Sequence, residues 1–311
     1  MRMTNGKSNR VSTSEAYHSF AGMAQGCIKQ LEECGKERTS ETYRSALKSF
    51  MRFRNDEDVN MNEMDSALML HYEAYLKLQG LTMNTISFYM RILRAVYNRA
   101  VDSGIIVQQY PFKNVYTGVA RTKKRSITIG FIKEIKHLEL PLHSSLDMAR
   151  DLFMFSFYMR GMSFIDLVSL KNSNLKDGRL TYSRRKTGQS LTIKWLECMR
   201  QIIEKHHEDS HDYLLPVISE CGDFRRQYDT ALHRVNYNLK RIGAMLGLQM
   251  PLTMYVARHS WASVARSINI PLSIISDALG HDSELTTQIY LSSLDASLID
   301  DANERIIESI G

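Results

Sequence analysis

The chain has 311 residues, 43% of them hydrophobic, and a formal net charge of +6. This length exceeds one ordinary hydrophobic core and predicts two domains. The sequence has no apolar run of about 18 residues and no apolar signal core near its start, which excludes a membrane span and favours an intracellular protein. The cysteines stand far apart without histidine companions, so we expect reduced thiols and no zinc site at Cys27, Cys34, Cys198 and Cys221.

Positive charge is clustered at residues 121–126, 184–186, 225–226 and 240–241. Each cluster by itself is typical of a solvated surface. Together the clusters favour nucleic acid as the partner, because lysine and arginine side chains that neutralise phosphates release condensed counterions.

The first hundred residues show helical periodicity. In residues 39–53, apolar side chains recur at helical spacing from Tyr43 to Phe50, and Thr39 or Ser40 is placed to cap the helix. A second helix is predicted over residues 84–101, with an apolar stripe formed by Ile86, Met90, Leu93 and Tyr97.

The other side of this second helix is polar. We predict that it lies along a DNA groove and contributes Asn84, Ser87, Arg91 and Arg94. The alternative is an amphipathic surface helix with its basic residues in water.

After Gly104 the helical pattern breaks. The following segment contains Pro111 and Gly118 and ends in the densest basic cluster, which predicts an interdomain linker over residues 108–126. Its candidate DNA contacts are Arg121, Lys123, Lys124 and Arg125.

Beyond the linker the pattern is mixed. A strongly apolar helix is predicted over residues 144–160, and Ser163 and Asp166 are spaced as a capping box for the next helix. Alternating apolar residues on either side of "KTGQ" predict a β-hairpin with its turn at residues 186–189. Helical periodicity returns after about residue 197, with breaks at Pro251 and Pro271. The sequence has no Gly-rich phosphate loop, no carboxylate cluster suited to magnesium and no HExxH motif.

The last third of the chain carries the most informative motif. It contains Arg258 in "RHSWAS", His281 in "LGH" and, nine residues later, Tyr290 in "TTQIY". These elements, in this order and spacing, resemble the signature of the tyrosine recombinases, the phage-integrase and Xer-like family. The hairpin with "KTGQ" resembles that family's catalytic-lysine hairpin, which assigns Lys186. The resemblance implies a mainly helical protein with a small β-sheet, in which a SAM-like core-binding domain precedes an α+β catalytic domain.

The chemistry of phosphodiester cleavage supports the same assignments. Attack on the phosphate needs a nucleophile, stabilisation of the nonbridging oxygens and a proton for the leaving alkoxide. Tyr290 would form a phosphotyrosyl ester, and the planar fork of Arg258 suits two phosphate oxygens. Lys186, on a mobile hairpin, would protonate the leaving 5′ oxygen, and His281 would bond the phosphate or help to take the phenolic proton. Neither a metal nor another cofactor is required.

Each assignment has a structural alternative. Tyr290 alone is typical of a buried helical tyrosine, and His281 alone of a locally bonded histidine at a helix start. Their shared spacing with Arg258 favours the catalytic interpretation. Lys186 alone is typical of a solvated turn lysine, in which case the phosphate contact is Arg184 or Arg185.

Two positions depart from the family pattern. The family's "G-x-R-x-x-E-L" aligns with "GMSFIDL", which places Ser163 where an arginine belongs. Arg160, near the start of the same helix, is a candidate substitute, and an arginine snorkelling at a helix end is the alternative. Tyr255 stands where the family has a histidine, and a phenol cannot accept a proton near neutral pH as an imidazole can. Both substitutions resemble those of integrase-like recombinases from Bacteroides-type bacteria.

The expected layout has five parts. They are a flexible N-terminus (1–14), a core-binding domain (15–107), the linker (108–126), a catalytic domain (127–300) and a C-terminal helix (301–311). The helix is expected either to dock into a neighbouring subunit or to fold back on its own domain. The short N-terminus leaves no room for an arm-binding domain, which favours a simple invertase, resolvase or integrase.

The resemblance also implies partners. We expect a homotetramer on two DNA duplexes with short inverted or direct repeats, in the bacterial cytoplasm at the nucleoid, with accessory DNA-bending proteins as further partners. The alternatives are a DNA-binding accessory protein that keeps the fold without catalysis, and an enzyme of the type IB topoisomerase kind.

Overall fold

The computed structural model describes residues 18–120, 125–206, 212–219, 221–281, 287 and 307–308. The chain divides into two compact units, Met1–Thr122 and Lys123–Gly311, each with its own hydrophobic core. All four cysteines are free thiols, and Cys27 is buried in the first core. Within these ranges, no helix has the length and apolar character needed to cross a membrane.

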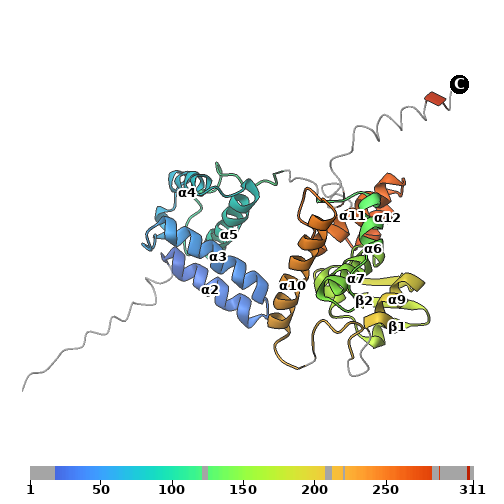
Figure 1. The fold of residues 1–311 in the computed structure, drawn as a ribbon. Helices are drawn as coiled ribbons and strands as arrows, with labels where there is room; N and C mark the ends of the chain where they lie inside the picture. The colour runs from blue at the N-terminus through green and yellow to red at the C-terminus, as the bar shows by residue number, and fades with distance from the viewer. Residues whose placement is uncertain are drawn as a thin grey trace, which may run out of the picture. The chain divides into compact units, whose positions relative to one another are not determined.

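The first unit is helical (Figure 1). Its elements are α2 (Phe20–Glu33), α3 (Glu37–Phe53), the 3₁₀ helix η1 (Met61–Glu63), α4 (Ser66–Leu78) and α5 (Met83–Asp102). In its core the ring of Phe50 packs edge-on against Phe20 and Tyr72, at centroid distances of 5.3 and 5.1 Å. The side chains of Asp65 and Thr82 cap α4 and α5.

Helix α3 begins earlier than the sequence predicts. Gly35 adopts a left-handed φ of +68° after α2, so the chain turns sharply and α3 starts two residues later. Ser40 lies inside the first turn, where its hydroxyl donates to the carbonyl of Glu37 at 2.8 Å. The predicted cap at Thr39 or Ser40 is therefore wrong.

Helix α5 buries the predicted apolar stripe, whose members are at most 1% exposed: Ile86, Met90, Leu93 and Tyr97. The segment after α5 folds onto the same core, with Phe112 and Val115 buried. The backbone N–H of Tyr116 donates to the carboxylate of Glu73 at 2.8 Å. The first part of the segment expected to be a linker thus packs with the first unit, because its apolar side chains bury surface there.

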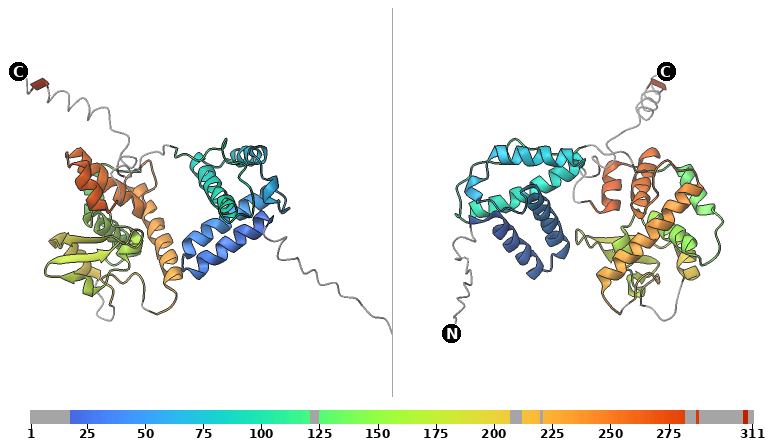
Figure 2. Two further views of the ribbon diagram at one scale, coloured as in Figure 1. Left: turned by 180° about the vertical axis from the view of Figure 1, so that it is seen from behind. Right: turned by 60° about the vertical axis from the view of Figure 1, so that its left-hand side comes forward.

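The second unit combines helices with a small antiparallel sheet (Figure 2). The helices before the sheet are α6 (Ile129–His137), α7 (Ser145–Tyr158) and the one-turn α8 (Phe164–Leu167). After η2 (Asn172–Asn174), the strands pair in the order β1 (Leu175–Lys176), β2 (Arg179–Ser183) and β3 (Ser190–Lys194). The helices that follow are α9 (Glu197–His206), α10 (Phe224–Met245), α11 (Met254–Ser267) and α12 (Leu272–Leu279).

Helix α7 is central to the second core. Its side chains Leu152, Phe153 and Phe155 are at most 1% exposed, and it contacts α6, α9, α10 and α11. A helix that is apolar on nearly all sides is stable only when other elements cover it, as the sequence of α7 predicts. The elements around α7 position the polar site described below.

Strands β2 and β3 form the predicted hairpin. Leu180, Tyr182, Leu191 and Ile193 are buried, and each alternates with exposed neighbours. The turn covers residues 184–189, where the N–H of Arg184 donates to the carbonyl of Gln189 at 2.9 Å. The hairpin prediction is confirmed, whereas the two-residue β1 is too short to show an alternating pattern.

Candidate active site

Arg258 of α11 ties two loops together. The residue is only 6% exposed. Its Nη1 donates to the carbonyl of Gly161 at 3.0 Å, and its Nη2 donates to the carbonyl of Leu279 at 2.6 Å. Gly161 lies in the turn after α7 and Leu279 is the last residue of α12. These backbone contacts fix the orientation of the guanidinium group before any substrate binds.

The turn after α7 requires glycine next to Arg258. A Cβ added to Gly161 would lie 2.5 Å from the Cα of Arg258, and the φ of Gly161 is +70°. Both features exclude a side chain. Arg160 precedes it with a φ of +58°. Arg160 therefore lies in a left-handed turn between α7 and α8, and not near the start of a helix as the sequence predicts.

His281 contacts the same guanidinium group. It follows Gly280, which ends α12 with a left-handed φ of +63°. Its Nε2 lies 3.1 Å from Nη2 of Arg258, and its Nδ1 lies 2.8 Å from the hydroxyl of the fully buried Thr287. Because a guanidinium group can only donate, Nε2 is assigned as the acceptor and Nδ1 as the protonated nitrogen.

Three arginines lie near enough to Tyr182, on β2, to act electrostatically on its hydroxyl group. Burial and the carboxylate of Asp166 raise the pKa of Tyr182 to about 12, against the lowering effect of Arg258, Arg184 and Arg160. These three arginines come from α11, the hairpin turn and the turn after α7. The site is therefore cationic and suited to an anion such as a phosphodiester.

The hairpin turn is anchored at three points. Nη1 of Arg184 donates to the carbonyl of Gly280, and the backbone N–H of Arg185 donates to Oδ1 of Asp166 at 2.9 Å. The guanidinium carbon of Arg185 lies 4.4 Å from the ring centroid of Phe224, at the start of α10. Contacts from α8, α10 and the end of α12 therefore hold Arg184 and Arg185, at the start of the turn that carries Lys186.

Asp166 also joins the hairpin to Ser163. Ser163 is the N-cap residue of α8, and its hydroxyl donates to Oδ2 of Asp166 at 2.6 Å without capping the helix backbone. The predicted capping box is wrong in its bonds, because the carboxylate is shared with the hairpin turn. Lys186, two residues after Arg184, is exposed on that turn.

Tyr255 and His259 lie one turn apart on α11. Tyr255 is 51% exposed, and the two rings are perpendicular with centroids 4.4 Å apart. Burial, followed by the charges of Arg125 and Arg258, lowers the pKa of His259 to about 4. His259 is not among the site residues predicted from the sequence, although its place directly after Arg258 is a usable signal.

Several predicted site residues lie outside the described ranges. They are the candidate nucleophile Tyr290, the basic residues Arg121, Lys123 and Lys124, and most of the predicted C-terminal helix. Of the described candidates, the structure brings together Arg258, His281, Arg160, Ser163, Arg184 and Arg185.

Three of the four predicted DNA contacts on α5, at Asn84, Ser87 and Arg91, have internal hydrogen-bond partners. Ser87 is fully buried, and its hydroxyl donates to the carbonyl of Gly118 at 2.6 Å. Asn84 bonds both the carbonyl and the N–H of Ala120, at 3.0 and 2.8 Å. The prediction that this side of α5 is open to DNA is corrected for Ser87, because its side chain is buried under the following segment. Asn84 and Arg94 are half-buried, and Arg91 is exposed.

Helix α10 has a basic outer face, which was not predicted from the sequence. Exposed side chains recur there every three or four residues: Arg226, Thr230, His233, Arg234, Tyr237, Lys240 and Arg241. Arg226 and Arg234 line an open groove of about 290 Å³ together with Val217 and Gln227. The sequence shows basic pairs at the two ends of this helix, at residues 225–226 and 240–241. Helical spacing of the polar residues between them predicts that they share one face.

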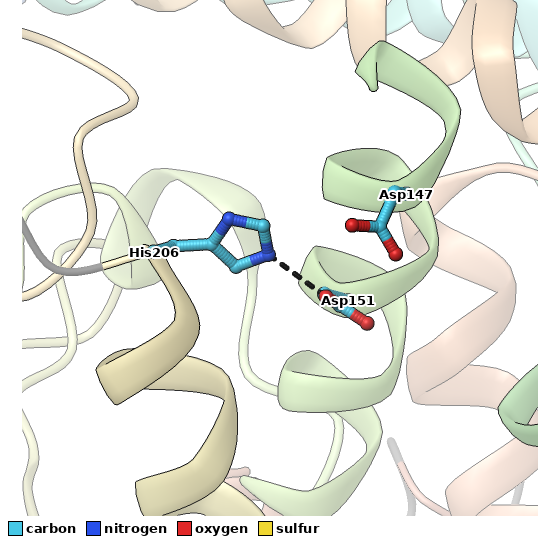
Figure 3. A group of neighbouring side chains, drawn as sticks. All are labelled: Asp147, Asp151 and His206. Carbon is cyan, nitrogen blue, oxygen red and sulfur yellow. Dashed lines mark hydrogen bonds and ion pairs between the residues drawn. The ribbon is translucent and has the colours of Figure 1, made fainter. Parts of the chain in front are cut away.

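A second charged cluster lies between α7 and α9 (Figure 3). Ligand atoms of Asp147, Asp151 and His206 lie within 4.8 Å of one another, as in a metal site. However, Nζ of Lys205 contacts the two carboxylates at 2.6 and 2.7 Å, and Arg150 pairs with both as well. Burial opposes ionisation of Asp151, but the bonds from His206 and Lys205 outweigh it and lower the pKa of that carboxyl group. A metal ion would have to displace Lys205, so we interpret the cluster as structural.

The comparisons with known proteins agree with this fold. The model of the phage integrase SAM-like domain matches residues 19–115, and the model of the phage integrase family matches residues 130–297. A tyrosine recombinase from Pseudothermotoga lettingae is 23% identical over 286 residues, which cover 88% of this chain and 93% of the relative. The chain therefore belongs to the phage integrase family. It is an enzyme of the tyrosine recombinase type, a site-specific DNA recombinase.

Solved structures share the fold. The lambda integrase tetramer bound to a Holliday junction is 17% identical with a TM-score of 0.63, over 90% of this chain and 83% of that one. The XerH recombinase bound to a palindromic difH substrate is also 17% identical, with a TM-score of 0.62, over 88% and 84% of the two chains. The predicted fold class, mainly helical with a small sheet and a SAM-like first domain, is confirmed.

Proposed function

We propose that this recombinase cuts DNA with Tyr290 and stores the broken bond as a 3′-phosphotyrosyl ester. The phenolic oxygen attacks phosphorus, the bond to the 5′ oxygen breaks, and the 5′ hydroxyl of another strand later reverses the step. The observation that carries the proposal is the guanidinium group of Arg258, fixed beside His281 in a cationic site. Tyr290 follows His281 by nine residues.

The other side chains have separate roles. Arg258 binds nonbridging oxygens and stabilises their developing charge. Lys186 gives a proton to the leaving 5′ alkoxide. His281 takes the phenolic proton on Nε2, because the hydroxyl of Thr287 holds the imidazole with its proton on Nδ1. The exposed hydroxyl of Tyr255 donates to a phosphate oxygen.

The DNA interface includes the outer face of α10. A two-sided helix with one exposed basic face fits a DNA groove and its flanking phosphates. Further phosphate contacts come from the basic residues Arg91, Arg94, Arg121, Lys123, Lys124, Arg125 and Arg185. Each contact releases counterions and makes binding dependent on salt.

The enzyme acts as a homotetramer on two duplexes with short inverted repeats, as an invertase or resolvase. The lambda integrase tetramer on a junction and the XerH complex with a palindromic site support this arrangement by analogy of fold. Accessory DNA-bending proteins assist the assembly. Because its substrate is DNA, the enzyme works in the bacterial cytoplasm, at the nucleoid.

A nicked suicide substrate tests the proposed chemistry. Repeats beside the gene supply the DNA, and a nick next to the cleavage point lets the short 5′ product diffuse away, so a covalent adduct accumulates. We expect an adduct with the natural chain and none with Tyr290→Phe, which keeps the ring but lacks the nucleophile. An adduct that survives in Tyr290→Phe contradicts the assignment. DNA binding without any adduct indicates a binding protein, and relaxation of DNA that lacks the repeats indicates a topoisomerase.

A further inference from the structure

Two guanidinium groups from different elements hold neighbouring carbonyl oxygens where α12 ends. Arg258 donates to the carbonyl of Leu279, and Arg184 donates to the carbonyl of the next residue, Gly280. A Cβ added to Gly280 would lie 3.3 Å from Cδ of Arg184, so the arginine stem packs directly on this backbone. Because consecutive Cα atoms are about 3.8 Å apart, the two cations lie close together beside His281.

The surroundings of Arg184 favour an anion. Arg184 is 8% exposed and Arg258 is 6% exposed. Among the described residues, no carboxylate forms an ion pair with Arg184. Burying one cation beside another costs free energy unless an anion joins them. A guanidinium group has five N–H donors, and the carbonyl of Gly280 takes one of those of Arg184, so donors remain for an oxyanion.

A short path connects Arg184 with the position of Ser163. The hydroxyl of Ser163 donates to one oxygen of Asp166 at 2.6 Å, and the other oxygen accepts the N–H of Arg185 at 2.9 Å. The backbone of the hairpin turn is thus two hydrogen bonds away from the side chain that stands in place of the family's arginine. A cation absent from α8 can therefore be supplied by the hairpin.

We propose that Arg184 is a catalytic residue, which holds the scissile phosphate together with Arg258. This inference deepens the proposed function and rests on it. Each guanidinium group contacts a nonbridging oxygen, and Ser163 is a positioning residue that fixes the hairpin through Asp166. Arg160 fits this role less well, because it is more exposed and no hydrogen bond with another described residue fixes its guanidinium group.

The test uses full-length variants and two nicked substrates. One substrate carries the natural phosphodiester, and the other carries a methylphosphonate at the cleavage point, which lacks one negative charge. The variants are Arg184→Ala and Arg160→Ala, and the matched control is Arg179→Ala, an exposed arginine at the other end of β2. On the phosphodiester, Arg184→Ala should slow adduct formation on the order of 100- to 1,000-fold, as loss of one oxyanion donor does. Arg160→Ala should lose less, and Arg179→Ala should match the natural chain.

The ratio of the rates on the two substrates shows whether Arg184 contacts the phosphate directly or only holds the backbone at Gly280. The uncharged methylphosphonate depends less on a second cation than the phosphodiester does. In Arg184→Ala, the ratio of the methylphosphonate rate to the phosphodiester rate should therefore rise about tenfold or more, which is equivalent to about 1.4 kcal/mol. If Arg184 only holds Gly280, both rates fall equally, and an unchanged ratio overturns the inference. Should Arg184→Ala fail to fold, Arg184→Gln decides, since its amide can still donate to Gly280 but carries no charge.

The two proposals fail in different ways. A natural chain that forms no adduct on either substrate contradicts the proposed function. Normal adduct formation by Arg184→Ala, with an adduct that still depends on Tyr290, contradicts only the role of Arg184.

Discussion

The two charged clusters of the catalytic domain differ in how their charges are balanced. Between α7 and α9, Arg150 and Lys205 face the carboxylates of Asp147 and Asp151. At the end of α12, by contrast, Arg184 is held by a backbone carbonyl and lies beside a second arginine. Both clusters are buried, so burial alone does not identify a binding site. The better indication of a binding site is that Arg184 has no carboxylate ion-pair partner among the described residues, because a bound phosphate would supply the missing negative charge.

Removal of a carboxylate from the balanced cluster should give the largest change in stability. In Asp147→Ala, the partly buried Arg150 and Lys205 lose a shared partner, and the free energy of unfolding should fall by about 3–5 kcal/mol. Urea denaturation measures this change. The folded fraction should still form the covalent adduct.

A surface ion pair is the matched control for that experiment. Glu197 pairs with Arg200 at 2.6 Å, and both side chains are more than half exposed. Glu197→Ala should leave the free energy of unfolding nearly unchanged, because water and salt screen an exposed ion pair. Equal losses in the two variants, or loss of the adduct by folded Asp147→Ala, would contradict the structural interpretation of the cluster.

The pH dependence of stability should report the burial of His259 beside the arginines of the active site. The pKa of His259 is lowered from 6.5 to about 4, so between these values the unfolded chain binds a proton that the folded chain does not. Stability from this residue is therefore present above pH 6.5 and is lost as the pH falls towards 4. The limiting slope for one proton is about 1.4 kcal/mol per pH unit.

Unfolding by urea at several pH values checks this slope. His259→Asn, which cannot take the proton, should lose less stability between pH 6.5 and 4 than the natural chain does. Identical curves would contradict the lowered pKa of His259, and with it the burial of its imidazole beside Arg125 and Arg258. Asp151, whose pKa is lowered from 3.8, adds its own loss of stability below about pH 5, so the slope from His259 is measured above that pH.

The smallest effect is expected on DNA binding, from a change on the exposed basic face of α10. Arg234→Ala should weaken DNA binding modestly and reduce the slope of log affinity against log salt by about 0.9, the value for one phosphate contact. Titrations at several salt concentrations measure the slope. Lys133→Ala, on α6, is the control and should leave it unchanged. An unchanged slope for Arg234→Ala would exclude this residue from the interface.

Local patterns made much of the fold predictable. The stripe of α5, the apolar α7 and the hairpin follow from periodicity and turn residues that lie within about 20 positions of one another. The cap of α3 was predicted wrongly, because the tight turn at Gly35 lets the helix start earlier than its polar residues indicate.

The site was predictable only where a motif spans it. Arg258 and His281 lie 23 residues apart in a recognisable pattern, and their side chains are 3.1 Å apart. The contact of Arg184 with Gly280 joins residues 96 positions apart, and that of His206 with Asp151 joins residues 55 positions apart. The first pair depends on how the hairpin packs against α12, and the second on how α9 packs against α7. One sequence does not reveal this packing.

The bond between His281 and Thr287 sets an upper limit on the reach of the chain that follows. The hydroxyl of Thr287 lies 2.8 Å from the imidazole, and the proposed nucleophile Tyr290 is three residues further along the sequence. Three extended residues span at most about 11 Å. If Tyr290 is the nucleophile, this short span favours cutting by each subunit's own tyrosine, and every protomer of an assembly would then carry a complete set of cutting residues.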